Sequence, residues 1–312
     1  MKNIKWLIAH QPEYLFLRTA KAFAKMLEEV APQYKIEILT TDQYKDKYDS
    51  NFTRGKIMDL VEKNEIQMSQ TEVWELEEVT RDKNFYVFDM PFLFDSHAHA
   101  RRVLEGPIGQ AINSRLRKQT GIRALAYTYS GGYRTVGTNT PIKNLSDLND
   151  KTLRINGNPV TQEYWKSLGV NINRSKSKFT RTGDDSANIT LEEGVDGKDT
   201  TYIRFQNAKN FLKSEHSLFL TDILISDKFF QELSKKDQDL FVKAASKAAR
   251  LERKWSQEDA DKFEETAKER GCDIVELSAE DQKEMRSKAE PIYEKWNKEF
   301  FPGLIKGIQK LQ

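Results

Sequence analysis

The sequence predicts an α/β protein made of two lobes. Patterns typical of strands and helices alternate in the N-terminal part of the chain, and a β-α-β-α-β order is typical of a parallel sheet with helices on its faces. The chain has 312 residues, and a domain usually holds roughly 100 to 200 residues. The length therefore predicts two lobes with a cleft between them.

Hydrophobic periodicity places the first elements of this pattern. We expect strands at residues 4–9, 34–39 and 65–68, and helices at residues 17–30 and around 57–61. If the three strands are parallel, their carboxyl ends lie at one edge of the sheet, where open α/β sheets bind ligands.

The strand ends carry polar residues. They fall at residues 10–13, 40–43 and 69–74. Glu13, Glu72 and Trp74 lie in these segments, so we expect them to face the cleft.

The middle of the chain begins with an aromatic run at residues 85–94, in which a proline limits any strand. Asp95 or Ser96 caps a short helix that ends near Leu104, and a second helix covers residues 108–118.

Two histidines, His97 and His99, lie in the first of these helices. A spacing of two residues directs them about 200° apart on a helix, which argues against a shared metal ion. We therefore expect neither a transition metal nor another cofactor, while oxygen ligands for sodium or calcium stay open around Asp184, Asp185 and Asn188.

Two further strands, at residues 123–129 and 133–138, flank Gly131 and Gly132. Because glycines absorb large backbone changes, the pair either marks a crossing between the lobes or forms a plain turn. The second strand carries Arg134.

The segment 151–169 has the pattern strand, turn, helix. Pro159 suits the first helical position because it lacks only an N–H that has no partner there. Arg154 lies at the strand end beside this helix start, and both features attract anions. The alternative is that Arg154 pairs with a structural acid, Asp147 or Asp150.

The C-terminal part continues the alternation. We expect a loop or mobile segment at residues 171–189, a turn at 194–197 and a central strand at 219–225. A helix with a kink follows from Ser234 to Arg270, then a strand at 273–277 and a last helix from Ser278 past Trp296.

Composition excludes several classes of protein. The net charge of +2 with 31% charged residues gives no field that would attract nucleic acid. The single cysteine, Cys272, excludes an intramolecular disulfide and is expected to be a small buried side chain.

No apolar run is long enough to span a membrane. Residues 1–5 lack the apolar region of a signal peptide, so either the protein is cytosolic or a leader was removed.

The order of several short motifs resembles one family, the extracytoplasmic solute-binding proteins of TRAP transporters, often called DctP-like. The resemblance covers nearly the whole chain. It is carried by Asp-Met-Pro-Phe-Leu-Phe at 89–94, His-Ala-Arg-Arg-Val-Leu-Glu-Gly-Pro-Ile-Gly at 99–109, Gly-Tyr-Arg at 132–134, Pro-Ile-Lys at 141–143, Asp-Leu at 147–148, Leu-Arg-Ile at 153–155, Leu-Gly at 168–169 and Val-Asp-Gly at 195–197.

The resemblance implies a two-lobed fold like that of periplasmic binding proteins, in which each lobe is a sheet flanked by helices and one long helix spans both. It implies one lobe at residues 1–128 plus about 212–250 and another at 129–211 plus about 251–312. Such a protein captures an organic acid in the cleft and delivers it to TRAP permease subunits in the membrane. We expect a monomer that is periplasmic in its mature form, with the signal peptide absent from this sequence.

The resemblance also assigns roles to residues. Arg154 matches the arginine that pairs with the ligand carboxylate, Arg134 matches a second arginine, and Glu72 lies near a pocket residue. The expected ligand-binding residues are Arg154, Arg134, Glu72, Thr200, Glu13, Trp74, Tyr129, Phe179 and Tyr202.

The sequence departs from the family in two places. Lys198–Thr201 replaces the usual Gln-Glu-Asn-Pro, so that Thr200 stands where the family has an asparagine. Residues 174–188 replace a proline-rich segment and are longer. Their four basic residues either add positive charge to the cleft or are solvated.

Two other classes of function remain open. The protein could present its ligand to a membrane sensor, or it could be a cleft enzyme that acts on a small acid. The enzyme has less support, because the chain has no nucleophile elbow, phosphate-binding loop, dinucleotide-binding motif or zinc-protease motif. The particular acid is not determined by the sequence.

Overall fold

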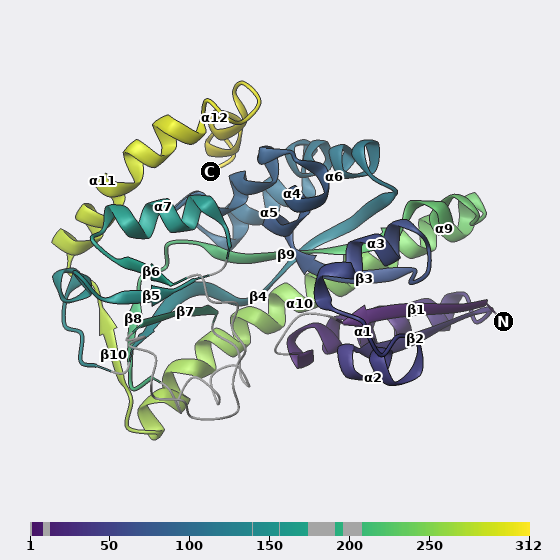
Figure 1. Ribbon diagram of the computed structural model, residues 1–312, viewed down its shortest axis with the longest axis horizontal. Coiled ribbons are helices and arrows are strands. Elements are labelled where there is room, and N and C mark those ends of the chain that lie inside the picture. The colour runs from purple at the N-terminus through teal and green to yellow at the C-terminus, as the bar shows by residue number, and fades with distance from the viewer. Residues whose placement is uncertain (1, 9–12, 139, 156, 174–190, 196–207) are drawn as a thin grey trace.

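A mixed sheet of ten strands organises the described part of the chain, and Figure 1 shows it in this computed structural model. The structure describes residues 2–8, 13–138, 140–155, 157–173, 191–195 and 208–312. The strand order is β2-β1-β3-β9-β4-β7-β5-β6, with β8 paired to β4 and β10 paired to β8. The strands are β1 (Lys2–Ile8), β2 (Tyr34–Thr40), β3 (Met68–Glu72), β4 (Ile122–Thr138), β5 (Thr152–Arg154), β6 (Asn171–Asn173), β7 (Leu191–Val195), β8 (Asn210–Lys213), β9 (Leu218–Ser226) and β10 (Asp273–Glu276).

Helices cover both halves of this sheet. They are α1 (Glu13–Val30), α2 (Thr41–Lys47), α3 (Ile57–Glu62), α4 (Leu76–Thr80), α5 (His97–Glu105), α6 (Pro107–Gln119), α7 (Pro159–Ser167), α9 (Asp227–Gln231), α10 (Lys235–Glu269), α11 (Ala279–Trp296) and α12 (Leu304–Gln309). Short 3-10 helices are η1 (Arg54–Lys56), η2 (Val73–Glu75), η3 (Lys83–Asp89) and η4 (Leu145–Leu148).

The N-terminal half confirms the predicted parallel start. Strand β1 pairs in parallel with β2 and with β3, so the carboxyl ends of all three strands lie at one edge. The sheet becomes mixed where β9 joins β3 in antiparallel orientation.

The position of β3 differs from the prediction of residues 65–68. The strand begins at Met68 and continues through four polar residues, Ser69 to Glu72, all of which are buried. It is polar because it lies between β1 and β9 and can bond to both: Ser69 Oγ donates to the carbonyl of Leu7 at 2.9 Å, and Gln70 Nε2 donates to Thr221 Oγ1 at 2.9 Å. Sequence periodicity cannot reveal such partners.

Strand β4 joins the two halves of the sheet. It pairs with β9 over Ile122–Tyr133 and with β7 over Arg134–Thr138. The predicted break at Gly131 and Gly132 is therefore a single strand with an irregular register between Tyr129 and Tyr133, not a turn. Gly132 has φ +72°, and a Cβ atom there would lie 3.2 Å from Cβ of Ala260 in α10. Glycine thus fits both the left-handed backbone and the close approach of the helix.

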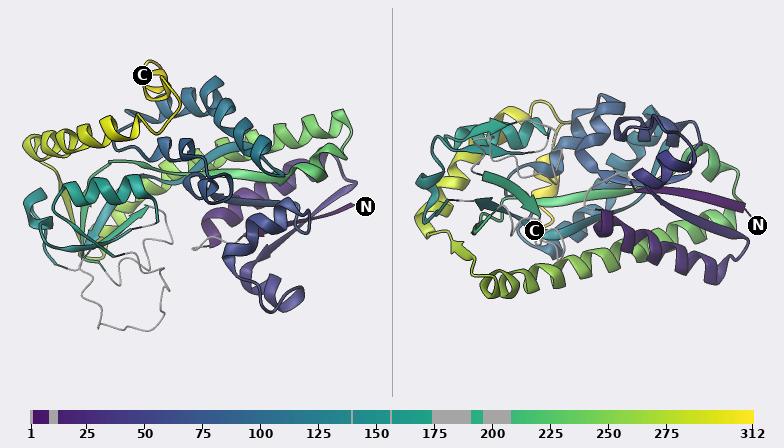
Figure 2. Two further views of the ribbon diagram at one scale, coloured as in Figure 1. Left: turned by 45° about the horizontal axis from the view of Figure 1, so that its top comes forward. Right: turned by 60° about the horizontal axis from the view of Figure 1, so that its bottom comes forward.

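Helix α10 spans both halves, as predicted, and Figure 2 shows it running the length of the molecule. Ser234 caps its start by accepting a hydrogen bond from the Asp237 N–H. In the N-terminal half it packs with α1 against one face of the sheet, and Phe241 there contacts the rings of Phe23, Tyr34 and Phe229. A second, larger core lies on the other face and extends into the C-terminal half.

Several other elements differ from the expectations. Helix α2 lies in a segment that shows no helical periodicity, and it forms because Thr40 and Gln43 make a capping box. The aromatic run is largely the buried 3-10 helix η3. Gly194 and Val195 belong to strand β7 instead of a turn, because they pair with Thr135 and Arg134 of β4.

At the C-terminus, α11 ends at Trp296 and a separate α12 follows. Figure 1 shows that α12 returns toward α6 in the middle of the molecule. Cys272 is buried among Phe211, Phe263 and Ala267, as expected.

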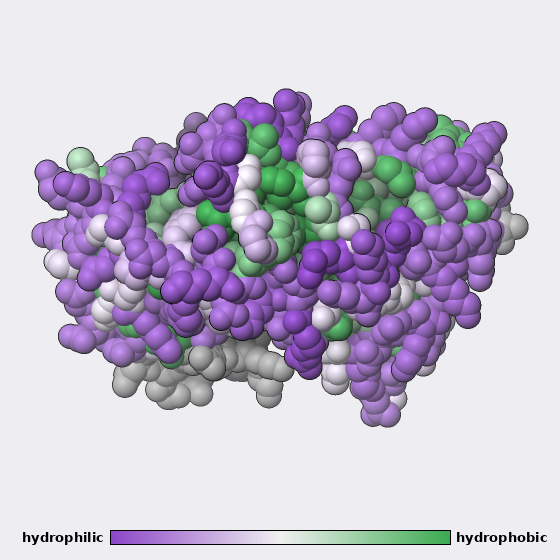
Figure 3. Space-filling model, turned by 90° about the horizontal axis from the view of Figure 1, so that it is seen from above, coloured by the Kyte–Doolittle hydropathy of each residue, from purple (hydrophilic) through white to green (hydrophobic). Residues whose placement is uncertain are grey.

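The surface is mainly hydrophilic on the face shown in Figure 3, with hydrophobic side chains gathered near its middle, in the region of α5, α6 and α12. Over the described residues, no helix combines the length and the apolar character that a membrane crossing needs.

The aromatic cluster around Phe241 predicts a large stability effect. We expect Phe241→Ala to lower the free energy of unfolding by about 3 to 5 kcal/mol, because it removes a fully buried ring and leaves a cavity. Urea unfolding followed by circular dichroism measures this. The matched control is Val242→Ala, since Val242 is the next residue of α10 and is 40% exposed. Similar losses for both variants would contradict the assignment of this core.

Candidate functional site

A cluster of buried charged and polar side chains lies where the two halves of the sheet meet. Glu72 comes from the end of β3, Trp74 from η2 directly after it, and Arg134 from β4 just beyond the irregular stretch. These three residues were all expected in the site. The fold brings them together although 60 residues separate Trp74 from Arg134 in the sequence.

The carboxylate of Glu72 is the centre of this cluster. Its Oε2 accepts a hydrogen bond from Trp74 Nε1 at 2.7 Å and lies 3.8 Å from Arg134 Nη2. Both charged side chains are 8% exposed. A buried charge needs an opposite charge or hydrogen bonds to offset the loss of hydration, so each group of this ion pair stabilises the other.

Arg134 is held by its backbone and by an aromatic ring. Its N–H donates to the carbonyl of Ser217 at 2.9 Å, and its own carbonyl accepts from the Ser214 hydroxyl at 3.2 Å and from the Glu215 N–H at 3.1 Å. The guanidinium carbon lies 4.9 Å from the ring centre of Phe219. A cation over an aromatic face is stabilised by the ring quadrupole, so the orientation of the guanidinium is fixed from two directions.

The turn after β5 lies against the same cluster. A Cβ atom at Gly157 would lie 3.0 Å from Cη2 of Trp74, so the absence of a side chain lets the indole ring contact this turn. Asn158 caps α7 by accepting from the Val160 N–H at 2.9 Å, and Pro159 is the first residue of the helix, as predicted.

Arg154 is the last residue of β5, on the strand that leads into this turn. Strand β7 lies between β5 and β4: Arg154 is opposite Glu192, and Arg134 is opposite Val195. The two arginines therefore come from strands two positions apart in one sheet, roughly 10 Å across. The side chain of Arg154 lies outside the described part of the structure, so its partner, including Asp147 or Asp150, stays a prediction.

The other expected residues have different positions. Glu13 is the first residue of α1, and its side chain is not among those that the structure describes. Phe179, Thr200 and Tyr202 lie outside the described residues, as do Asp184, Asp185 and Asn188.

Tyr129 is buried and bonds to residues other than those of the cluster. Its hydroxyl lies 2.8 Å from His97 Nδ1 and accepts from Gln257 Nε2 at 3.4 Å. The His97 ring also stacks on the Tyr129 ring, with centroids 5.3 Å apart. This arrangement ties β4 to α5 and α10 where the strand passes between the halves. Its role as a ligand-binding residue stays a prediction.

The two neighbouring histidines point to different partners. His99 Nε2 lies 2.9 Å from the carbonyl of Ile308 in α12, whereas His97 bonds to Tyr129. Nowhere in the described residues do three or more His, Cys, Asp or Glu side chains form a group that could hold a metal ion.

Sequence reasoning missed some residues near the cluster. Gln70 is 2% exposed on β3, two residues before Glu72. Ser217 is 6% exposed, and within the described residues its hydroxyl has no hydrogen-bond partner. A buried polar atom without a partner costs about 1 to 3 kcal/mol, so such an atom beside Arg134 suits a ligand contact. In the sequence, the polar run at residues 69–72 could have indicated Gln70. No sequence pattern singles out Ser217.

The fold is that of a two-lobed α/β protein, and the buried pair of Arg134 and Glu72 lies where the two halves of its sheet meet. The sequence pattern of the family described as "Bacterial extracellular solute-binding protein, family 7" matches residues 9–176 and 197–299. The chain belongs to this family. The resemblance drawn from the short motifs is thereby confirmed.

Relatives and solved structures agree with this membership. The chain is 27% identical over 190 residues to the 2,3-diketo-L-gulonate-binding periplasmic protein of Escherichia coli, a match that spans 61% of this chain and 57% of that relative. The structure is similar to a TRAP periplasmic solute-binding protein from Desulfovibrio desulfuricans with bound sn-glycerol-3-phosphate, with a TM-score of 0.88, 20% identity and coverage of 99% and 97% of the two chains. A similar protein from Pseudomonas putida F1 holds D-glucuronate, with a TM-score of 0.83, 22% identity and coverage of 99% and 97%.

The contact between His97 and Tyr129 predicts a dependence of stability on pH. Burial lowers the pKa of His97 below its usual value of 6.5, although the charge of Asp261 acts in the opposite direction. The unfolded chain therefore binds a proton at this residue more readily, and stability falls as the pH drops through about 6.5 toward the folded pKa. We expect His97→Gln to show a smaller loss than the wild type between pH 8 and pH 5.5.

Urea unfolding of both proteins at several pH values measures this difference. Subtracting one curve from the other removes the contribution of every other titrating group. A difference that is constant across this range would contradict the prediction.

Proposed function

We propose that this protein captures an organic acid by its carboxylate between the two lobes and delivers it to a TRAP-type membrane permease. The observation that carries the proposal is the buried cluster of Arg134, Glu72 and Trp74 beside the end of strand β5, where Arg154 lies. The protein is proposed to act in the periplasm as a monomer, without a metal ion or cofactor.

Charge is the first argument. Arg134 already has an acidic neighbour in Glu72, at 3.8 Å. Two arginines and one glutamate leave one positive charge, which one ligand carboxylate balances. In this scheme Arg154 makes the main contact with two parallel hydrogen bonds, and Arg134 orients the ligand from the neighbouring strand.

The second argument concerns the rest of the ligand. The Trp74 indole covers Gly157, and a flat apolar wall of this kind suits the carbon face of a sugar acid or a ring. The Ser217 hydroxyl could bond to a ligand hydroxyl. Thr200 is proposed to replace the asparagine that the resemblance places at this position.

The similar proteins bear on the class of ligand. Those from E. coli and P. putida carry a keto sugar acid or a sugar acid in their names, and that from D. desulfuricans carries a phosphate ester. All three ligands are small oxygen-rich anions. We therefore propose a hydroxy or keto acid as the ligand of this chain.

Closure of the lobes is part of the proposal. One lobe would comprise residues 1–128 with about 212–250, and the other residues 129–211 with about 251–312. By these bounds, strand β4 and helix α10 cross from one proposed lobe to the other. The irregular stretch of β4 around Gly132 is where backbone rotation would require least disruption of pairing.

The site predicts a strong dependence on Arg154. A thermal-shift screen of sugar acids, keto acids, dicarboxylates and phosphate esters identifies the ligand, since a ligand at a hundred times its Kd adds about 2.7 kcal/mol of stability. Arg154→Lys keeps the charge but loses the fork, so we expect Kd to rise about ten- to a hundredfold, and Arg154→Ala should bind more weakly still.

Isothermal titration of the folded variants measures these affinities. The matched control is Arg101→Ala, because Arg101 is exposed on α5. Binding by Arg154→Ala within about threefold of the wild type would show that Arg154 is structural. Stabilisation by phosphate esters alone would overturn the carboxylate assignment.

Closure predicts a change of shape. We expect small-angle X-ray scattering to give a smaller radius of gyration when the ligand from the screen is present at saturation. The same measurement on Arg154→Ala, at the same ligand concentration, serves as the control and should show little change. An unchanged radius in the wild type, with binding confirmed by titration, would argue against a hinge.

A further inference from the structure

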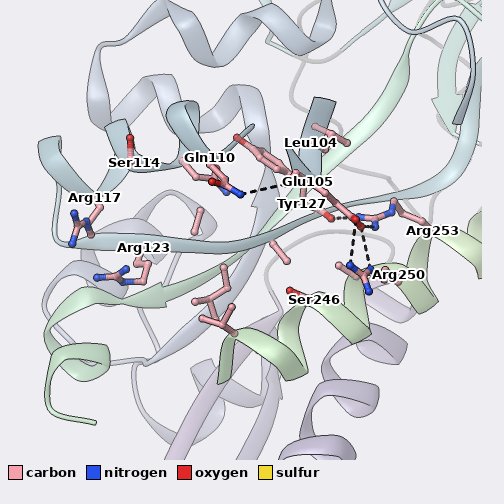
Figure 4. Close-up of a pocket in the computed structure, with 16 residues that line it drawn as sticks. Leu104, Glu105, Gln110, Ser114, Arg117, Arg123, Tyr127, Ser246, Arg250 and Arg253 are labelled. Carbon is pink, nitrogen blue, oxygen red and sulfur yellow. Dashed lines mark hydrogen bonds and ion pairs between the residues drawn. The ribbon is translucent and has the colours of Figure 1, made fainter. Parts of the chain in front are cut away.

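A groove away from the candidate ligand site lies between α6 and α10, and Figure 4 shows it in close-up. Its volume is about 560 Å³. Strand β4 forms its floor from Arg123 to Tyr127, and α6 and α10 form its walls. It therefore contains one edge of the sheet between two helices.

The floor of the groove is an open strand edge. Over residues 122–129, β4 pairs with β9 on one side, and its pairing with β7 begins only at residue 134 and that with β8 at residue 136. Among the described strands, none pairs with the other side of this stretch. An open edge carries backbone N–H and C=O groups that can bond to an added strand.

Helix α10 protects only one end of this edge. Arg253 Nη1 donates to the carbonyl of Tyr127 at 2.6 Å, and the Ser256 hydroxyl donates to the carbonyl of Tyr129 at 2.6 Å. The Thr128 hydroxyl in turn donates to the carbonyl of Ala249 at 3.3 Å. The stretch from Arg123 to Ala126 lies outside these contacts and spans roughly 13 Å, enough for about four residues of an extended peptide.

The side chains along this stretch leave space for such a peptide. Ala124 and Ala126 of the floor are small and half-buried, and Ser114 and Ser246 on the facing walls are small and polar. The register irregularity between Ala124 and Ala126 twists the strand locally. Bulges are common at sheet edges and beside functional sites.

The charge of the lining selects the occupant. The groove is lined by four arginines and one glutamate, a net charge of +3. At one end, Arg250 and Arg253 both donate to Glu105, with Arg250 Nε at 3.2 Å and Nη2 at 3.3 Å. At the other end, Arg123 pairs with Asp227 at 2.7 Å.

Arg117 differs from the other three arginines. It is exposed in the last turn of α6, and within the described residues it has no ion-pair or hydrogen-bond partner. Figure 4 shows it at the same end of the groove as Arg123. An occupant with carboxylates would be attracted to this end, whereas a basic one would be repelled.

We infer that this groove binds an extended, acidic peptide segment of a partner protein, which adds to the free edge of β4 as an antiparallel or parallel strand. Main-chain hydrogen bonds to Arg123–Ala126 hold the segment, and Arg117 selects its acidic side chains. Strand addition at an exposed sheet edge is a recurring mode of peptide recognition. The inference does not depend on the ligand proposed for the site between the lobes.

The test uses the full chain and a defined probe, a fluorescein-labelled peptide of four Glu-Thr repeats. We expect saturable binding by fluorescence anisotropy at low salt, and no binding of the corresponding Lys-Thr peptide. Arg117→Glu should weaken binding at least fivefold. The matched control is Lys118→Glu, which makes the same change of charge in the same helical turn outside the groove lining and should stay within twofold.

Two further arms separate strand addition from charge attraction alone. Ser246→Trp, which fills the groove without a change of charge, should abolish binding, with circular dichroism confirming the fold. A Glu-Thr peptide with N-methyl groups on alternate residues should also fail to bind, because it lacks the backbone donors.

Other outcomes would overturn the inference. Equal affinity of the methylated and unmodified peptides would show electrostatic adsorption only, and absence of saturable binding would show that the edge is merely protected. A dimer in sedimentation velocity that Arg117→Glu disrupts would assign the groove to a second copy of this chain. Displacement of the peptide by millimolar phosphate would assign it to a small anion.

Discussion

The arrangement of this protein depends on one hydrogen-bonded strand that belongs to both halves of the sheet. Strand β4 pairs with β9 up to Tyr133, with β7 from Arg134 onward and with β8 from Val136 onward, so that beyond Val136 it lies between β7 and β8. Backbone hydrogen bonds must be satisfied in the interior, and the chain therefore cannot separate here without losing them. Helix α10 runs beside this stretch and approaches it closely at Gly132. A relative motion of the halves would have to be accommodated here, in α10 and in the segment between β8 and β9.

The charged site follows from the same geometry. Arg134 is the first residue of β4 that pairs with β7, and its side chain reaches the end of β3, where Glu72 and Trp74 lie. An unpaired buried charge costs free energy because it loses its hydration. A buried charge also attracts an opposite charge more strongly than an exposed one does. The chain belongs to a family described as bacterial extracellular solute-binding proteins, and the buried pair of Arg134 and Glu72 lies where the two halves of the sheet meet.

The groove between α6 and α10 has a different electrostatic character. Arg117, Arg123 and Arg250 are at least partly exposed, whereas Arg253 is buried, and three of the four arginines already have acidic partners. At 0.1 M salt, interactions between exposed charges more than about 10 Å apart are largely screened. Such a surface favours weak, reversible and salt-dependent contacts, whereas the buried site is screened much less. The two proposals accordingly name different partners, a segment of a macromolecule at the strand edge and a small molecule between the lobes.

The sequence by itself determined the features that depend on neighbouring residues. The helix start at Pro159, the Ser234 cap of α10, the central strand β9 and the candidate arginines on β4 and β5 all follow from local patterns or short motifs. Only the tertiary structure decided the rest. The polar strand β3, the continuity of β4 through its glycines and the contact of Trp74 with Gly157 require partners far away in the chain. A polar residue becomes a stable part of a core only where the fold supplies its hydrogen-bond partner, and that partner is invisible to local periodicity.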